Sequence, residues 1–203
     1  MMKKIITFSF IFILCTTRLL SNDINILNFD VAGIKLKMDP KTVIQKLKSK
    51  YHLKNDDIIV FFNHNPFGKK YKKNINLSGV TTIKSDRGIS PEISVDFCIS
   101  EANKKSEVET VYYSIPGTQE NKKKIQEAAI KKYGKPTISH KGILSTTYIW
   151  CNNNEAKDAI SCKQKDYSIY LKLVSTSISL YSSECSMNNI KIREKRNNTT
   201  PNF

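Results

Sequence analysis

Glycine and histidine are both scarce in this chain, which has seven glycines and three histidines among 203 residues. Phosphate-binding loops and nucleophile elbows depend on closely spaced glycines, and none of GxGxxG, GxxxxGK[ST] and GxSxG occurs in the sequence. No cysteine pair has CxxC spacing and no two histidines lie three to five residues apart, so the ligand spacing of common zinc sites is missing as well. We therefore expect no cofactor and no metal, and we predict that the protein is not an enzyme.

His64 is the histidine with the best case for a functional role. It lies in the polar loop Asn63–Phe67, directly after an expected strand over Ile58–Phe62. Loops held by a sheet often carry binding residues, and Phe67 and Tyr71 are close by in the sequence. Catalysis also needs a nucleophile and an orienting group, and no spaced pair of carboxylates marks one. We take His64, Phe67 and Tyr71 as candidate binding residues and name no catalytic residue. A secreted hydrolase that acts through the His64 loop is the alternative.

The N-terminus has the order of an export signal. Lys3 and Lys4 precede a nearly continuous apolar run, Ile5–Leu14, and a short polar stretch then leads to Ser21. The run is about ten residues long, half of the roughly 20 that a membrane-crossing helix requires, so a membrane anchor fits less well. We predict a signal peptide over residues 1–21 and a periplasmic or secreted mature protein with no transmembrane segment.

The charge balance points to the kind of partner. Basic residues outnumber acidic ones by 33 to 18, a formal net charge of +15. Loss of residues 1–21 leaves about +12, which favours an acidic partner. The lysines are scattered, and the runs Lys69–Lys73 and Lys122–Lys124 do not form an arginine-rich, aromatic nucleic-acid platform. We expect a protein or an envelope component rather than a specific nucleic acid. A secreted virulence or host-contact factor that uses its positive surface is a further alternative.

The cysteines indicate disulfides. Four remain after the expected cleavage: Cys98, Cys151, Cys162 and Cys185. An even number in an exported chain is typical of two disulfides, with three pairings open. Cys151 ends one apolar stretch and Cys162 precedes another, so a bond between them would close a polar loop. We predict Cys151–Cys162 on this ground, and Cys98–Cys185 by elimination. Zinc is the alternative that the spacing disfavours.

Caps and apolar stripes predict two helices. Asp39 and Pro40 read as an N-cap and a proline in the first helical position, and Thr118 caps a second helix that Gly134 ends. The stripe of the first helix is Val43, Ile44, Leu47 and Tyr51, and that of the second is Ile125, Ala128, Ala129 and Tyr133.

Strands are expected around these helices. Their ranges are 24–31, 34–36, 58–62, 93–99, 108–115, 146–151, 167–174 and 177–181. Alternation in 167–174 puts one apolar face toward a core, although Tyr170 is apolar on the polar side. This pattern predicts an α+β fold in which two strand-helix-strand units pack their helices on one face of an antiparallel sheet. We expect a single domain over residues 22–186, with an internal duplication, and a disordered basic tail over residues 187–203.

Two short motifs carry a resemblance. Phe29–Pro40 resembles the opening D-x-x-G-I-x-L-G-M-[ST]-[PK]-x-x-V of many exported bacterial proteins, and Lys131–Pro136 resembles the KYGxP after their second helix. Both motifs are similar to helix-plus-sheet repeats of SmpA/OmlA-type outer-membrane assembly lipoproteins and of β-lactamase-inhibitor-like proteins. Lys37 stands where that pattern has glycine, Asp39 where it has Ser or Thr, and no lipid-attachment cysteine matches. The resemblance implies a binding or assembly module and brings no catalytic residues.

Overall fold

The elements of the fold come from a computed structural model, which describes residues 25–63, 76–82, 91–143, 145–153, 155–164 and 166–199. The helices in these ranges are α1 (Pro40–Tyr51), α2 (Gln119–Tyr133) and α3 (Glu184–Thr199), with 3-10 turns η1 (Ile26–Asn28) and η2 (Asn55–Asp57). The strands are β1 (Ile58–Asn63), β2 (Asn76–Thr82), β3 (Glu92–Ile99), β4 (Ser106–Ser114), β5 (Ile138–Lys141), β6 (Thr146–Trp150), β7 (Lys163–Gln164), β8 (Tyr167–Val174) and β9 (Ser177–Ser182).

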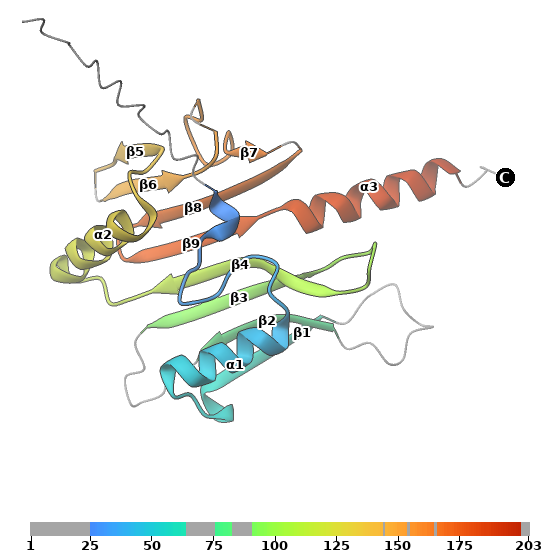
Figure 1. Ribbon diagram of the computed structural model, residues 1–203, viewed down its shortest axis with the longest axis horizontal. Helices are drawn as coiled ribbons and strands as arrows, with labels where there is room; N and C mark the ends of the chain where they lie inside the picture. The colour runs from blue at the N-terminus through green and yellow to red at the C-terminus, as the bar shows by residue number, and fades with distance from the viewer. Residues whose placement is uncertain are drawn as a thin grey trace, which may run out of the picture.

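The strands form one antiparallel sheet. Their order is β1-β2-β3-β4-β9-β8-β6-β5, and β7 pairs with β8 outside this path. Both α1 and α2 lie over the same face of the sheet (Figure 1). This arrangement agrees with the predicted α+β class.

Each half of the sheet is a helix followed by four strands. α1 precedes β1 to β4, α2 precedes β5, β6, β8 and β9, and the last strand of each half pairs with the other at the centre. The predicted strand-helix-strand units are not confirmed. For the predicted strands 24–31 and 34–36, the described residues 25–31 and 34–36 form no strand; η1 and an isolated bridge between Val31 and Ile34 lie there instead. Ala32 and Gly33 between them have φ of 58° and 86°, a tight turn that breaks the extended run.

The predicted helix ends are confirmed. Asp39 Oδ1 accepts a hydrogen bond from the Thr42 N–H at 3.0 Å, so the side chain caps α1. Thr118 caps α2 in the same way, and Gly134 ends that helix with φ of 80°. Both helices therefore begin and end where local sequence chemistry places them.

The core lies between these helices and the sheet. Val43 and Leu47 of α1 are fully buried, as are Leu171 and Leu180 of the central strands. Ile125, Ala129 and Tyr133 are the buried residues of α2. Ala128, which we assigned to the same stripe, is exposed, because at this point the helix surface turns away from the strands.

The segment before α1 ties the two halves together. The Tyr133 hydroxyl donates to the Asp30 carbonyl at 2.7 Å, and Lys132 Nζ lies 2.8 Å from Asp30 Oδ1. Partial burial opposes ionisation of the Asp30 carboxyl, but the hydrogen bond and charge of Lys132 outweigh it and lower its pKa. Trp150 Nε1 donates to the Gly134 carbonyl at 2.9 Å, which anchors the end of α2 to β6.

Both predicted disulfides are confirmed. Cys151 bonds Cys162 across a separation of 11 residues, and Cys98 bonds Cys185 across a separation of 87. The short loop packs over Ile149, whose side chain is buried together with Cys151 and Cys162. The Cys98–Cys185 bond joins β3 to the first turn of α3. Disulfides of this kind are typical of oxidising compartments.

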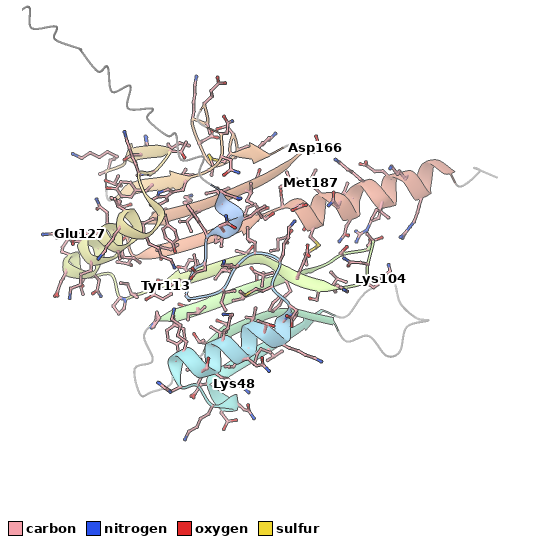
Figure 2. All side chains as sticks on the ribbon, in the orientation of Figure 1. Lys48, Lys104, Tyr113, Glu127, Asp166 and Met187 are labelled. Atoms are coloured by element: carbon pink, nitrogen blue, oxygen red, sulfur yellow. A yellow bond between two sulfur atoms is a disulfide. The ribbon has the colours of Figure 1, made fainter. Side chains whose placement is uncertain are left out.

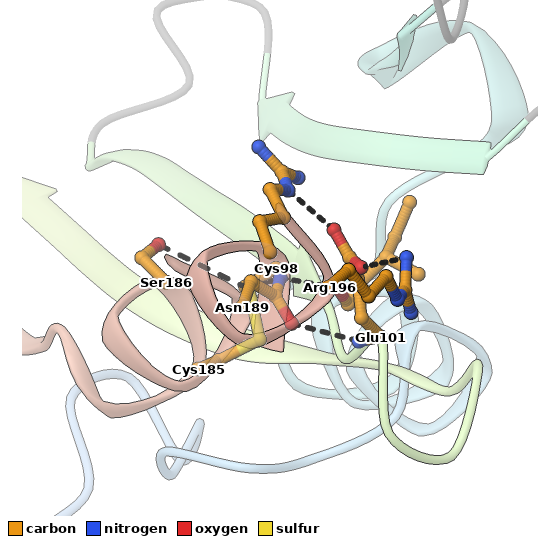
Figure 3. Close-up of polar contacts among 8 residues, drawn as sticks. Cys98, Glu101, Cys185, Ser186, Asn189 and Arg196 are labelled. Atoms are coloured by element: carbon orange, nitrogen blue, oxygen red, sulfur yellow. Dashed lines mark hydrogen bonds and ion pairs between the residues drawn. A yellow bond between two sulfur atoms is a disulfide. The ribbon is translucent and has the colours of Figure 1, made fainter. Parts of the chain in front are cut away.

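The C-terminal segment 187–203, which we expected to be disordered, instead belongs to α3 as far as Thr199; residues 200–203 lie outside the described residues. The Cys98–Cys185 bond fixes the first turn of α3 to β3. Asn189 is buried: its Nδ2 donates to the Ile99 carbonyl and its Oδ1 accepts from the Glu101 N–H, both at 2.7 Å (Figure 3). Hydrogen bonds and a disulfide, rather than an apolar stripe, hold this helix to the sheet. The sequence of α3 therefore lacks the periodic apolar residues by which a helix is usually recognised.

Ion pairs hold the second half of α3. The Glu101 carboxylate pairs with Arg193 and, at 3.0 Å, with Arg196, and the hydrogen bond from Arg193 lowers the pKa of Glu101. On the opposite side Lys191 pairs with Asp166, which lies at the start of β8 next to α3 (Figure 2). The helix is thus held from two hairpins. No helix in the described ranges is both long and apolar enough to cross a membrane.

Candidate functional site

The residues that the sequence nominates for binding, His64, Phe67 and Tyr71, lie outside the described residues. Residues 1–21 lie outside them as well. The roles of His64, Phe67 and Tyr71 and the signal peptide therefore stay predictions. The candidate site is instead built from described residues of β3, β4, β9, β8 and β6.

Many of the residues on the sheet face opposite α1 and α2 carry hydroxyl groups. Strand side chains alternate between faces, and Val95, Val111, Leu180 and Leu171 point into the core, so the residues on either side of them point outward. Strand register sets these outward residues in three rows: Ser94, Tyr112, Ser179 and Lys172; Asp96, Thr110, Tyr181 and Tyr170; Ser114, Ser177, Val174 and Thr147. Helices α1 and α2 lie over the other face (Figure 1), and the first turn of α3 is fixed to the end of β3 by the Cys98–Cys185 bond. We call these three rows the open face.

Hydrogen bonds join part of the open face across the central strand pair. The Ser177 hydroxyl donates to the Ser114 hydroxyl at 3.1 Å, and Tyr112 and Ser177 share a further hydrogen bond of 3.0 Å between their hydroxyls. β4 and β9 are the last strands of the two halves, so this chain of hydroxyls crosses the boundary between them. The groups are held in place before any partner arrives, which lowers the entropy cost of binding.

Two tyrosines mark the other end of the open face. The rings of Tyr170 and Tyr181 lie 5.2 Å apart between centroids, within the range of a favourable aromatic contact. Burial, and then the nearness of Tyr181, raise the pKa of Tyr170. Tyr170 also packs against the cluster around the Cys151–Cys162 disulfide. The disulfide loop therefore covers the sheet beyond Tyr170 and limits the open face on that side.

Charged groups are few on the open face. Among its twelve residues the charged side chains are Lys172 and Asp96, which are of opposite sign. Neighbouring groups shield the Asp96 carboxyl in part from water and so raise its pKa. The chain as a whole has a net charge of +15, so the near-neutral open face differs from its surroundings. Depletion of charge at the centre is typical of protein interfaces.

The open face presents hydroxyl groups and aromatic rings. The Ser177 hydroxyl forms hydrogen bonds with the hydroxyls of Ser114 and Tyr112. Among the described residues, no histidine or carboxylate forms a hydrogen bond with these three hydroxyls. The described residues contain no group of three or more His, Cys, Asp or Glu side chains that could hold a metal ion. Tyrosine offers a large, rigid surface with a polar end, and serine offers adaptable hydrogen bonds, the combination that antibody paratopes use.

Most of this site could not be identified from the sequence, although one signal was visible in it. Tyr170 interrupts the polar side of β8, and the run Ser177–Tyr181 alternates Ser, Ser and Tyr with Ile178 and Leu180. That alternation marks an outward face of hydroxyl-bearing residues. What the sequence does not contain is the pairing of β4 with β9, which brings Tyr112 beside these serines.

Comparison with known proteins adds no relative. No family model, no curated protein and no solved structure matches the chain.

Proposed function

We propose that this protein is an exported, non-catalytic binding module that holds a protein partner against the open face. The observation that carries the proposal is the composition of that face: three tyrosines, six serines and threonines, and one valine, with two compensating charges. Tyr, Ser and Thr in such a surface give rigid contact area and adaptable hydrogen bonds. The partner we infer is a folded protein of the periplasm or the cell envelope, or one met outside the cell.

The charge of the remaining surface supports an acidic partner. The mature chain, with a net charge of about +12, creates a positive field that speeds the approach of an acidic protein, while the near-neutral open face makes the close contact. Two disulfides and the predicted signal peptide support the exported location. We therefore propose that the positive charge of the chain attracts the partner and that the tyrosines of the open face bind it.

The resemblance to helix-plus-sheet assembly and inhibitor proteins points the same way. Lys37 stands where that pattern has glycine, and its φ is 64°, the left-handed conformation that glycine favours. The departure at this position therefore changes the residue but keeps the turn. The backbone at Lys37 thus fits the motif of these proteins, and this fit supports a binding or assembly role. We propose that the open face is the surface that binds.

The test uses the mature chain, residues 22–203, in two steps. Affinity capture from an envelope extract first identifies an interacting protein, and the purified pair is then measured for affinity and association rate across a salt series. The double variant Tyr112→Ser and Tyr181→Ser should weaken binding tenfold or more, about the effect of removing an interface hot spot. Ile130→Ser, which changes an exposed apolar residue on α2, is the matched control and should bind as the natural chain does.

Two outcomes would contradict the proposal. If the double tyrosine variant binds as tightly as the Ile130→Ser control, the open face is not the contact surface. If the mature chain hydrolyses generic ester, peptide or phosphate substrates and His64→Ala abolishes that turnover, the hydrolase alternative replaces the binding module. Added salt should slow association more than it speeds dissociation, because it screens the steering field over about 8–10 Å.

A further inference from the structure

A cavity lies between α2 and the sheet, on the face opposite the open face. It has a volume of about 440 Å³ and is bounded by the first two turns of α2, by β6 and its preceding turn, and by the β8–β9 turn. Figure 1 shows α2 beside these strands at one end of the sheet. Cavities of about 300–1,000 Å³ are the usual size of small-molecule sites in proteins.

Amide and hydroxyl side chains account for half of the residues that line this cavity. Gln119 and Gln126 contribute amides from α2, and Ser145, Thr146 and Ser175 contribute hydroxyls from the strand side. Amides and hydroxyls can each donate and accept hydrogen bonds, so this lining matches a ligand that carries several hydroxyl groups. The two glutamines come from α2, and the three hydroxyl-bearing residues come from the strand side of the cavity.

An apolar surface completes the lining. The Tyr148 side chain and Leu173, which is 1% exposed, border the cavity from β6 and β8. A sugar ring has hydroxyl groups around its edge and C–H groups on its faces, so an aromatic ring beside amides and hydroxyls suits it. A lipid tail would leave the amides and hydroxyls without hydrogen-bond partners, which is costly.

One positive charge in the cavity remains uncompensated. Lys123 lies 4.0 Å from Glu127, so these two lining charges offset each other, and Glu120 pairs with Lys124. Lys122 is half-buried, lines the cavity, and has no acidic partner among the described side chains. A ligand with a single negative charge therefore fits better than a nucleotide, whose phosphates would need several cations.

We propose that this cavity binds an acidic monosaccharide unit, with the carboxylate at Lys122, the ring hydroxyls at the glutamines and serines, and one ring face on Tyr148. The site is separate from the open face, so the protein has two surfaces: one for a protein partner and one for an acidic glycan. Saccharide recognition of this kind does not depend on the proposed function.

Isothermal titration and protein NMR with glucuronate as the probe test the site in the mature chain. Glucuronate should bind saturably, and Lys122→Gln should weaken its binding at least tenfold. Lys131→Gln removes an exposed positive charge from the same helix outside the cavity, so this control should bind as the natural chain does. Glucose should bind the natural chain about as weakly as glucuronate binds Lys122→Gln, because both pairs lack the charge contact.

A second variant separates the sugar contacts from the charge. Gln126→Ala should weaken glucuronate and glucose alike, whereas acetate should show no saturable binding to any variant. The proposal is overturned if glucuronate fails to saturate, if Lys122→Gln and Lys131→Gln bind it equally, or if inorganic phosphate binds as tightly as glucuronate, which would mean a simple anion site. Partner binding at the open face should not change in Lys122→Gln, so failure of one proposal is distinguishable from failure of the other.

Discussion

Removal of the Cys98–Cys185 bond should lower the free energy of unfolding more than removal of the Cys151–Cys162 bond. The two bonds close chain segments of 87 and 11 residues. A cross-link stabilises the folded state mainly by restricting the unfolded chain, and the loss grows with the logarithm of the loop length. Loops of these lengths correspond to about 4.6 and about 2.8 kcal/mol at 25 °C, a difference of about 1.8 kcal/mol.

Urea unfolding of two double variants measures this difference. The variants are Cys98→Ala with Cys185→Ala, and Cys151→Ala with Cys162→Ala. Trp150 is the single tryptophan of the chain and is fully buried, so its fluorescence reports unfolding of the core directly. The slope of the free energy against urea should also increase more for the long-loop variant, because its unfolded state exposes more surface.

A variant with all four of these cysteines replaced by alanine, which lacks both bonds, serves as a control. The natural chain in reductant should unfold at the same urea concentration as this variant. Because Asn189 and the Glu101 ion pairs still hold α3, the long-loop variant should keep a single cooperative transition. Equal losses in the two variants, or a greater loss from the 11-residue loop, would show that native packing around the sulfurs outweighs the restriction of the unfolded chain.

Two further stability predictions follow from the core and from the segment before α1. Leu47→Ala should lower the free energy of unfolding by about 2–5 kcal/mol, the range for a buried large-to-small change, while Gln45→Ala on the exposed side of α1 should change it by less than about 0.5 kcal/mol. Because the folded-state pKa of Asp30 is lowered, its carboxylate stabilises the protein above about pH 4 and loses that effect as the pH falls through the folded pKa. The stability advantage of the natural chain over Asp30→Asn should therefore shrink between about pH 5 and pH 2 in unfolding titrations, and Lys132→Gln should remove most of that pH dependence. A constant advantage across this range would exclude the Asp30–Lys132 pair as its source.

Local chemistry predicted the helix ends and several strands. Asp39, Thr118 and Gly134 act through hydrogen bonds to residues three or four positions away, and Pro40 acts through its own fixed φ, so the local sequence contains all that these helix ends require. The same holds for β8, which spans Tyr167–Val174 as its alternation predicts. The Cys151–Cys162 pair followed from the apolar stretches beside these two cysteines, and the Cys98–Cys185 pair followed by elimination. The fold brings the Cα atoms of the two pairs to 5.6 and 6.1 Å from each other.

Long-range pairing was not predictable from the same patterns. The strands β2 and β5 gave no apolar alternation, and the central β4–β9 pair joins residues more than 60 positions apart. The open face depends on that pair and on which side of the sheet α1 and α2 cover. Tyr112 and Ser177 are therefore ordinary strand residues in the sequence and become neighbours only in the fold.

The order of the cysteines along the chain has a consequence for biogenesis. Cys98 pairs with Cys185, and the Cys151–Cys162 pair lies between them, so one bond is nested inside the other. A chain that enters an oxidising compartment from its N-terminus presents Cys98 and then Cys151 long before Cys185, and joining cysteines in order of arrival gives the wrong pair. Correct oxidation requires either that Cys98 stays reduced until β9 has formed or that thiol–disulfide exchange corrects an early bond. A host for recombinant production should therefore supply a disulfide isomerase as well as an oxidant.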